Sequence, residues 1–157
     1  MEGALDWADA EQQCTVWRDE GLRVVFTNGC FDLLHPGHIT YLEQARSLGD
    51  RLIIGLNDDG SVRGLKGDAR PINPQGVRAR MISALRAVDA VVLFSQSTPK
   101  ALIVALHPAV LVKGGDYCAE EIVGAVEVRG WGGEVRVVPF VGDFSTTALI
   151  QRIRALS

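Results

Sequence analysis

Two histidines, three residues apart, lie where a loop leads into a helix. Residues 27–38 read TNGCFDLLHPGH, with His35 and His38 flanking Pro36 and Gly37. Proline suits the first turn of a helix, and the N-terminus of a helix presents free N–H groups and the positive end of its dipole. Because both imidazoles lie at that terminus, they can reach one small anion. The spacing therefore predicts a phosphate-binding loop, in which Gly29 permits a tight backbone turn.

Two simpler interpretations compete with phosphate binding. The histidines can cap the helix, or they can bind a metal ion as an H-x-x-H pair. A metal ion requires further ligands, and the remaining histidine of the chain, His107, lies on a distant element. We favour phosphate binding.

Cationic side chains follow in a polar, glycine-bearing stretch. Lys66 lies where an ammonium group can neutralise charge that develops on a phosphate, although a solvated surface lysine is the simpler alternative. Arg70 and Arg78 can hold phosphate oxygens in bidentate fashion, or Arg78 can form a salt bridge on its own helix. The stretch thus predicts a second set of groups for an anionic substrate.

Small and polar residues follow the later strands as well. Gly114 and Gly115 either let a ligand approach the backbone or form a tight turn, and Asp116 is a candidate partner for a ribose or a metal ion. Ser145 is suited to cap the last helix, and the same helix N-terminus can bind phosphate. Asp59 follows the second predicted strand, where a loop N-cap explains it as well as a ligand contact does.

The first loop resembles the H-x-G-H signature of the cytidylyltransferase-like nucleotidyltransferases. In that family the two histidines and nearby amides stabilise the α-phosphate of a nucleotide as pyrophosphate leaves. Three further motifs, LKGDARPINP at 65–74, LVKGGDY at 111–117 and STT at 145–147, are similar to those of the adenylyltransferase domain of bifunctional heptose kinase/adenylyltransferases. The resemblance extends from about residue 20 to the end of the chain, with the motifs in the same order.

The resemblance implies a role for each matching residue. The expected catalytic residues are His35, His38 and Lys66. The expected nucleotide-binding residues are Thr27, Asn28, Gly29, Cys30, Phe31, His35, Gly37, His38, Lys113, Gly115, Asp116, Ser145, Thr146 and Thr147. The expected sugar-phosphate-binding residues are Asp32, Asn57, Asp59, Lys66, Arg70 and Arg78. Mg²⁺ is expected to arrive with ATP, and its protein ligand is not assigned.

The activity that the resemblance implies is transfer of AMP from ATP to a sugar 1-phosphate, D-glycero-D-manno-heptose 1-phosphate, giving ADP-heptose for lipopolysaccharide synthesis. Phe140 stands where cytidylyltransferases of the glycerol-3-phosphate type have an arginine, which argues against cytosine. The alternatives are a cytidylyltransferase that forms a CDP-alcohol such as CDP-glycerol, or a nucleotide-binding module without turnover. The resemblance also suggests a homodimer or larger assembly and a separate sugar kinase.

Short apolar runs alternate along the chain with helical apolar patterns, and they predict the elements that position these residues. Strands are expected at 23–27, 51–56, 89–94, 109–112 and 135–138, and helices at 5–20, 36–49, 75–87, 99–106, 120–129 and 146–156. Residues 57–74 are predicted to be a long loop. Strands that alternate with helices indicate a parallel sheet, so the predicted fold is a Rossmann-like three-layer α/β/α sandwich with about five strands. Met81, Ile82, Leu85 and Val88 are expected to face inward.

Composition limits the classes of function. The 157 residues carry 16 basic and 19 acidic side chains, a net charge of −3, which argues against a nucleic-acid or membrane-surface protein. The three cysteines form no C-x-x-C pair, so neither a disulfide framework nor a zinc site is expected. We predict one cytoplasmic domain over 1–157, with an outer helix in 1–20 and a catalytic core in 21–157. No G-x-G-x-x-G or P-loop motif supports a dinucleotide oxidoreductase or a P-loop enzyme.

Overall fold

The computed structural model describes residues 2–115, 117–140 and 142–157, and its centre is a parallel sheet. The sheet has five strands in the order β3-β2-β1-β4-β5, which confirms the predicted α/β class. The strands are β1 (Val24–Gly29), β2 (Arg51–Asn57), β3 (Ala90–Phe94), β4 (Val110–Gly114) and β5 (Glu134–Val138).

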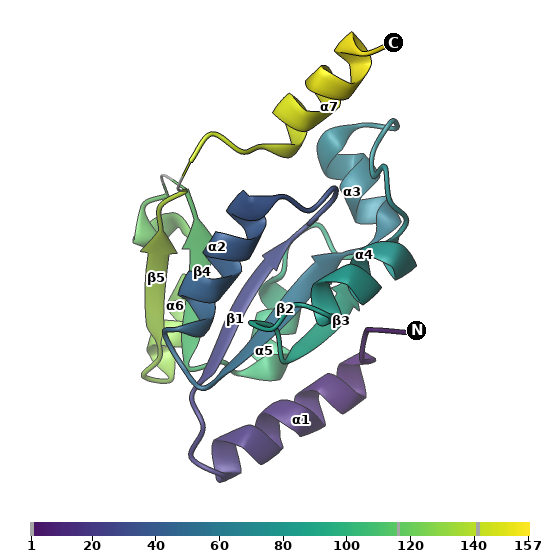
Figure 1. Ribbon diagram of the computed structural model, residues 1–157. Helices are drawn as coiled ribbons and strands as arrows, with labels where there is room; N and C mark the ends of the chain where they lie inside the picture. The colour runs from purple at the N-terminus through teal and green to yellow at the C-terminus, as the bar shows by residue number, and fades with distance from the viewer. Residues whose placement is uncertain (1, 116, 141) are drawn as a thin grey trace.

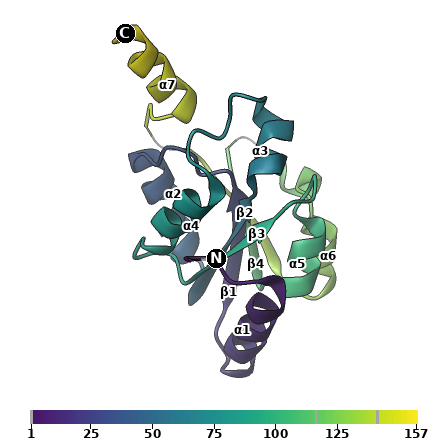
Figure 2. The same ribbon diagram turned by 90° about the vertical axis from the view of Figure 1, so that its right-hand side faces the viewer.

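Helices cover both faces of this sheet, which gives the three predicted layers (Figures 1 and 2). One face carries α1 (Trp7–Asp19), α5 (Lys100–Leu106) and α6 (Ala125–Gly130). The other face carries α2 (Pro36–Arg46) and α4 (Gln75–Ser83). A short helix, α3 (Asp59–Lys66), follows β2, and α7 (Thr146–Ala155) points away from the sheet (Figure 1).

Alternation along β1 shows how the sequence builds two cores. Val24 and Phe26 pack among residues of α1, α5 and α6, whereas Val25 packs among residues of α2 and α4. All three side chains are fully buried. A central parallel strand is covered on both sides, so it reads as a continuous apolar run rather than as an alternating one.

The strand order places a topological switch point between β1 and β4. The chain proceeds outward from β1 through β2 to β3, then returns to β4 on the other side of β1. In such sheets the crevice outside the carboxyl ends of the two diverging strands is where ligands bind. The loops that follow β1 and β4 therefore face the position where a site is expected.

Two parts of the predicted secondary structure are wrong near this edge. The first strand does not end at Thr27, because Asn28 and Gly29 continue the ladder opposite Gly55 and Leu56. The predicted loop at 57–74 contains α3, which Asp58 caps by accepting a hydrogen bond from the Ser61 N–H at 2.8 Å. The apolar positions of α3 are only Val62 and Leu65, and Gly60 and Gly64 interrupt it, so the stripe is too short to be recognised as a helix from sequence.

Other differences concern helix limits and faces. The helix predicted at 120–129 divides into a 3₁₀ turn at Ala119–Glu121 and α6, because Gly124 adopts a left-handed conformation with φ +89°. Met81 is exposed rather than inward, whereas Ile82 and Val88 are buried. The last helix forms as predicted, but none of its residues is buried.

The N-terminal segment covers the free edge of β3. Leu5 donates its N–H to the carbonyl of Val91 at 2.8 Å, and the indole Nε1 of Trp7 donates to the carbonyl of Leu93 at 2.8 Å. These contacts satisfy edge carbonyls that would otherwise be available to another strand.

All three cysteines are free. Across the part of the chain that the structure describes, no helix has the length and apolarity that crossing a membrane requires.

Candidate functional site

A cavity of about 880 Å³ opens at the carboxyl ends of β1 and β4. Its wall includes the loop after β1, the N-terminus of α2, the end of α3, the end of β4 and the segment before α7. Its volume lies within the usual range for small-ligand sites. We call this space the main cavity.

The two histidines lie face to face at the start of α2, on the wall of the main cavity. Their ring centroids are 3.8 Å apart, with an angle of 23° between the ring planes. His35 is the N-cap residue and Pro36 occupies the first helical turn, as the sequence predicted. Phe144 lies nearly parallel to His35, with a centroid distance of 6.2 Å. The chain thus places a stack of three rings beside the free N–H groups of a helix.

Packing keeps the histidine pair neutral near pH 7. Burial, with a smaller contribution from the neighbouring His35 and against the opposing influence of Asp32, lowers the pKa of His38 from 6.5 to about 4. Burial also lowers the pKa of His35. The Nδ1 atom of His38 accepts the backbone N–H of His35 at 3.3 Å. A neutral His38 ring therefore carries its proton on Nε2, which makes that atom a hydrogen-bond donor.

The loop between β1 and α2 holds an unusual backbone. Phe31 and Leu33 have φ values of +47° and +53°, a region that side chains other than glycine rarely occupy. A Cβ on Gly29 would lie 2.9 Å from the ring of Phe31, so only glycine fits there. Strained backbone of this kind persists only where the surrounding contacts fix it, and it is concentrated at functional sites.

Three cations line the main cavity: Lys66, Arg70 and Lys113. Lys66 is the last residue of α3 and is exposed. Burial lowers the pKa of Lys113, whose ammonium nitrogen lies 5.4 Å from the ring centre of Tyr117. Lys66 and Arg70 come from the end of α3 and the loop that follows it, whereas Lys113 comes from β4, so the charge of Lys113 meets the other two only in the folded chain. A cavity of this charge favours a multiply charged anion.

Asp32 anchors residues 67–74, the loop after Lys66 that we call the lysine loop, to residues 30–35, the loop before α2 that we call the histidine loop. Its carboxylate is buried and accepts hydrogen bonds from Arg70 Nε at 3.0 Å, from the Ile72 N–H at 2.6 Å and from the Asn73 N–H at 2.9 Å. Burial raises the pKa of this carboxyl group, but the two backbone N–H groups and the Arg70 guanidinium outweigh it and hold the pKa below its ordinary value. Asp32 lines the cavity, but its carboxylate oxygens already accept hydrogen bonds from other groups of the protein.

Arg78 is a buried brace and does not reach the main cavity. Its guanidinium donates to the carbonyls of Cys30, Asn57 and Asn73 at 2.8, 2.8 and 2.9 Å. It also forms an ion pair of 2.8 Å with Asp59. The predicted contact of Arg78 and Asp59 with a sugar phosphate stays a prediction, because in this structure the two groups bond to each other and Arg78 also bonds to buried backbone.

The N-terminus of α7 completes the wall. Ser145 caps the helix by accepting the N–H of Ala148 at 3.0 Å, as predicted. The Thr146 hydroxyl donates to the carbonyl of Asp32 at 2.9 Å, which joins this terminus to the histidine loop. Thr147 lines the cavity beside them.

Most of the predicted site residues lie together on the wall of the main cavity. Lining the main cavity are Asn28, Gly29, Cys30, Phe31, Asp32, His35, Gly37, His38, Asn57, Lys66, Arg70, Lys113, Ser145, Thr146 and Thr147. Thr27 does not line it, because the buried Thr27 hydroxyl is hydrogen-bonded to Tyr41 at 2.6 Å. Gly115 also lies off the wall, where it donates its N–H to the carbonyl of Val138 at 3.0 Å. The predicted role of Asp116 lies outside the described residues.

A family comparison agrees with this arrangement. The model of the cytidylyltransferase-like family matches residues 26–152, which include every loop of the main cavity. The chain belongs to the cytidylyltransferase-like family.

Individual relatives narrow the position within the cytidylyltransferase-like family. Over 150 residues the chain is 55% identical to the "Bifunctional protein HldE" of Magnetococcus marinus, covering 96% of this chain and 31% of that protein. It is 58% identical over 136 residues to the protein of the same name from Koribacter versatilis, covering 87% of this chain and 28% of that protein. The chain therefore spans about a third of the length of these relatives.

The fold of this chain also matches that of a solved structure. It is the lipopolysaccharide core biosynthesis protein from Thermoplasma volcanium, with a TM-score of 0.63 and 27% sequence identity. The match covers 79% of this chain and all of that chain.

The predicted site residues leave out several residues of the cavity wall. Leu65, Gly114 and Tyr117 lie within the quoted motifs, and Phe140 was considered only for the choice of base. Tyr41, Gly142, Asp143 and Phe144 lie outside the motifs. The segment from Phe140 to Phe144 has two aromatic residues and a glycine directly before the predicted helix cap, and that composition was the available signal. Tyr41 gave none, because its position on an inward face of α2 reads as core.

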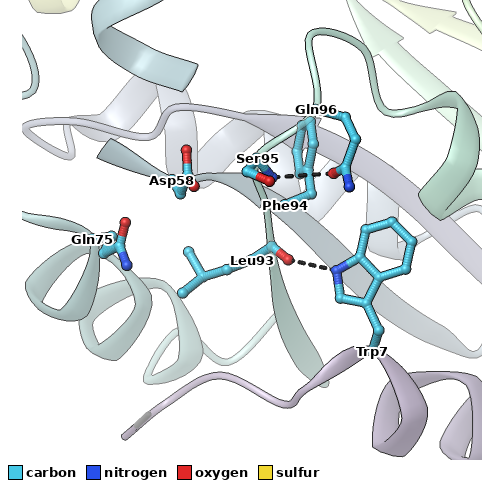
Figure 3. A pocket seen from close by; sticks show the side chains of 7 residues that line it. All are labelled: Trp7, Asp58, Gln75, Leu93, Phe94, Ser95 and Gln96. Atoms are coloured by element: carbon cyan, nitrogen blue, oxygen red, sulfur yellow. Dashed lines mark hydrogen bonds between the residues drawn. The ribbon is translucent and has the colours of Figure 1, made fainter. Parts of the chain in front are cut away.

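A second, smaller cavity of about 160 Å³ lies beyond β3, next to the start of α1 (Figure 3). Its lining residues are Trp7, Asp58, Gln75, Leu93, Phe94, Ser95 and Gln96. None of these seven side chains is cationic. The indole Nε1 of Trp7 donates to the Leu93 carbonyl, and the backbone N–H of Ser95 donates to the Gln96 side chain (Figure 3). The main cavity, in contrast, is lined by the cations Lys66, Arg70 and Lys113.

Proposed function

We propose that this chain transfers AMP from ATP to a sugar 1-phosphate, D-glycero-D-manno-heptose 1-phosphate, giving ADP-heptose and pyrophosphate. The observation that carries the proposal is the stacked histidine pair at a helix N-terminus, surrounded by three cations in one cavity. The motif resemblance to heptose adenylyltransferases and the 55–58% identity to bifunctional HldE proteins support the choice of substrate.

The proposed reaction is an in-line displacement at the α-phosphorus of ATP. An oxygen of the sugar phosphate attacks the α-phosphorus, the bond from that phosphorus to the bridging oxygen breaks, and pyrophosphate leaves with the electron pair. The attacking oxygen is already anionic, so no general base is required. The work of the protein is to position the reactants and to stabilise the added negative charge.

Each group on the wall has a part in this step. His35 and His38, as neutral rings, donate hydrogen bonds to the α-phosphate together with the N–H groups of the α2 terminus. The cation on Lys66 neutralises charge on the same phosphate. Ser145, Thr146 and Thr147 hold the departing pyrophosphate at the N-terminus of α7. Asn28, Lys113 and the backbone of the first loop hold the rest of the nucleotide, and Arg70 holds the phosphate of the sugar.

The wall suits Mg²⁺ as an ion carried by the triphosphate. Among the described residues no three His, Cys, Asp or Glu side chains gather into a metal site. The cavity-lining carboxylates in that part of the chain are Asp32, whose oxygens bond to Arg70 and to backbone, and the exposed Asp143. Mg²⁺ commonly binds through substrate phosphates with one or two carboxylates and several waters. Asp143 would hold it, and the ion would supply charge neutralisation along the triphosphate.

The proposal extends to partners and location. We propose that a sugar kinase supplies the sugar 1-phosphate for this reaction. We also propose a homodimer or larger homo-oligomer, and a cytoplasmic reaction that uses the ATP pool there.

The test is pyrophosphate release in the presence of Mg²⁺. ATP and CTP are each combined with heptose 1-phosphate and with glycerol 3-phosphate. The proposal expects release only with ATP and the heptose. Release only with CTP and glycerol 3-phosphate would overturn it in favour of a cytidylyltransferase, and nucleotide binding without release in any combination would indicate a module without turnover.

A further inference from the structure

Exposed aromatic rings gather at one place on this molecule. Among the described residues, the three aromatic side chains classed as exposed are Tyr117, Phe140 and Phe144, with 53%, 72% and 60% of their surface accessible. All three line the main cavity. The other aromatic residues are buried or partly buried. A group of exposed apolar rings around a polar cavity marks a surface that contacts a ligand.

Phe140 is the most exposed of the three, and its ring lies directly over two glycine residues. A Cβ on Gly114 would lie 2.8 Å from Cε1 of the Phe140 ring, and a Cβ on Gly115 would lie 3.1 Å from Cε2. The ring thus rests on the backbone at the end of β4, where any larger residue than glycine would displace it. Tyr41 supports it from the side, with ring centroids 6.3 Å apart and an angle of 58°.

The position of Phe140 differs from that of Phe144. Phe144 lies parallel to His35, at the phosphate end of the main cavity. Phe140 lies at the end of β4, the strand next to the one that leads into the histidine loop. A nucleotide whose α-phosphate meets the histidines must extend its base along the wall, and Phe140 presents there an exposed ring held from behind and from the side.

We propose that Phe140 is the stacking platform for the nucleobase and that it selects for the base by its aromatic face. The inference rests on the proposed function, because it requires a nucleotide in the main cavity. Stacking of a base on an aromatic side chain contributes about 1–3 kcal/mol. The bicyclic ring of adenine offers a larger face than a pyrimidine does, so an apolar platform favours ATP over CTP.

The experiment compares a ligand that has a base with one that has none. Binding of Mg²⁺-ATP and of inorganic tripolyphosphate is measured by calorimetry for the whole chain and for Phe140→Leu, which removes the ring and keeps an apolar side chain. Phe140→Trp retains an aromatic face. Val126→Ala is the control, because Val126 is an exposed apolar residue of α6 that does not line the cavity.

Phe140→Leu is expected to weaken ATP binding by about 5- to 150-fold, the fold-change that corresponds to loss of one stacked base, and to leave tripolyphosphate binding unchanged. Phe140→Trp and Val126→Ala should bind ATP as the unaltered chain does. In turnover assays, Phe140→Leu should raise the KM for ATP with little change in kcat, since stacking stabilises ground state and transition state alike.

The failure of this inference is distinct from the failure of the proposed function. Equal weakening of ATP and tripolyphosphate, or no weakening of either, would overturn the role of Phe140 while the unaltered chain still binds and turns over ATP. If the unaltered chain binds neither ligand, the nucleotide site itself is wrong and the platform is wrong with it.

Discussion

His35 and His38 lie parallel at the N-terminus of α2, and this packing decides the charge that they carry. A charged imidazole next to another one, with restricted access to water, is costly, so the pair stays neutral. His38 still acts as a donor because its Nδ1 accepts a backbone N–H and its proton therefore lies on Nε2. Neutral donors of fixed direction stabilise charge that develops in a transition state without a change in protonation.

Removal of either ring is expected to lower kcat by about 10²-fold or more, the effect of losing one fixed donor to a developing oxyanion. The variants are His35→Asn and His38→Asn, measured by pyrophosphate release. His107→Asn is the matched control, because His107 stacks on Trp131 and does not line the main cavity. Asparagine also tolerates the left-handed backbone of His107, whose φ is +51°. Near-normal turnover in His35→Asn or His38→Asn would contradict the mechanism.

The neutral state of His38 also predicts how stability depends on pH. In the unfolded chain its pKa returns to about 6.5, whereas in the folded chain the pKa is about 4. Between these values the unfolded chain binds the proton more readily, so the contribution of His38 to stability is full above pH 6.5 and is lost as the pH falls toward 4.

Thermal unfolding from pH 7.5 to pH 4.5 should therefore show a Tm that falls less steeply for His38→Asn than for the unaltered chain. An NMR titration of the His38 ring should give a midpoint near 4. A midpoint near 6.5 would show that packing does not lower the pKa of His38 and would contradict the assignment.

At the scale of elements, Arg78 on α4 holds three segments together. Its guanidinium joins the histidine loop, the end of β2 and the lysine loop through the carbonyls of Cys30, Asn57 and Asn73. Asp32 joins the lysine loop to the histidine loop from the other side. The loops of the cavity are thus positioned by buried charged groups rather than by apolar packing alone.

The two arginines of α4 give a matched test of this brace. Arg78 is 1% exposed, whereas the side chain of Arg80 is 67% exposed and pairs with Glu2 at the surface. Arg78→Met leaves buried carbonyls and Asp59 without their donor, so we expect a loss of about 3–5 kcal/mol in the free energy of unfolding. Arg80→Met should cost less than about 1 kcal/mol. Equal losses of unfolding free energy for Arg78→Met and Arg80→Met, measured in urea, would mean that Arg78 does not hold these segments together.

Most of the elements that periodicity predicted have a buried stripe, although α7 was also predicted and has no buried residue. The strands from β1 to β5, and α2, whose buried Leu42 and Ala45 are three residues apart, were within reach of sequence alone. Helix α3 was missed because Gly60 and Gly64 interrupt it and Val62 is its single buried residue. The N-cap at Asp58 was the signal that would have revealed it.

For the site too, part was predictable from sequence and part was not. Residues that the family motifs pointed to, among them His35, His38 and Lys66, lie together on the wall of the main cavity. The place of Arg78 was not predictable, because its carbonyl partners Cys30 and Asn57 are 48 and 21 residues away in sequence. Long-range partners of this kind depend on tertiary packing, which a single sequence does not reveal.

At the scale of the whole molecule, α7 stands apart from the three layers (Figure 1). None of its residues is buried, and Ile153 is exposed. Its first turn nevertheless lines the main cavity, and Thr146 is hydrogen-bonded to Asp32. Any contact that fixes α7 therefore also fixes part of the proposed phosphate site, which connects the proposed oligomer to the proposed reaction.

Light scattering should report a mass greater than that of one chain, and Ile153→Glu should reduce it, because a carboxylate is costly in an apolar contact. Val126→Glu, at an exposed valine of α6, is the control and should leave the mass unchanged. A single-chain mass for the unaltered protein would contradict the homo-oligomer. Whether residues 1–157 act as one domain stays a prediction.

The fate of the α-phosphorus tests the central claim most directly. ATP labelled at the α-phosphorus is incubated with the protein, Mg²⁺ and heptose 1-phosphate, and the labelled products are separated. The account predicts that the label appears in ADP-heptose in amounts equal to the unlabelled pyrophosphate released. Label recovered as free AMP or free ADP, with no sugar nucleotide formed, would show that the main cavity does not transfer an adenylyl group to a sugar phosphate.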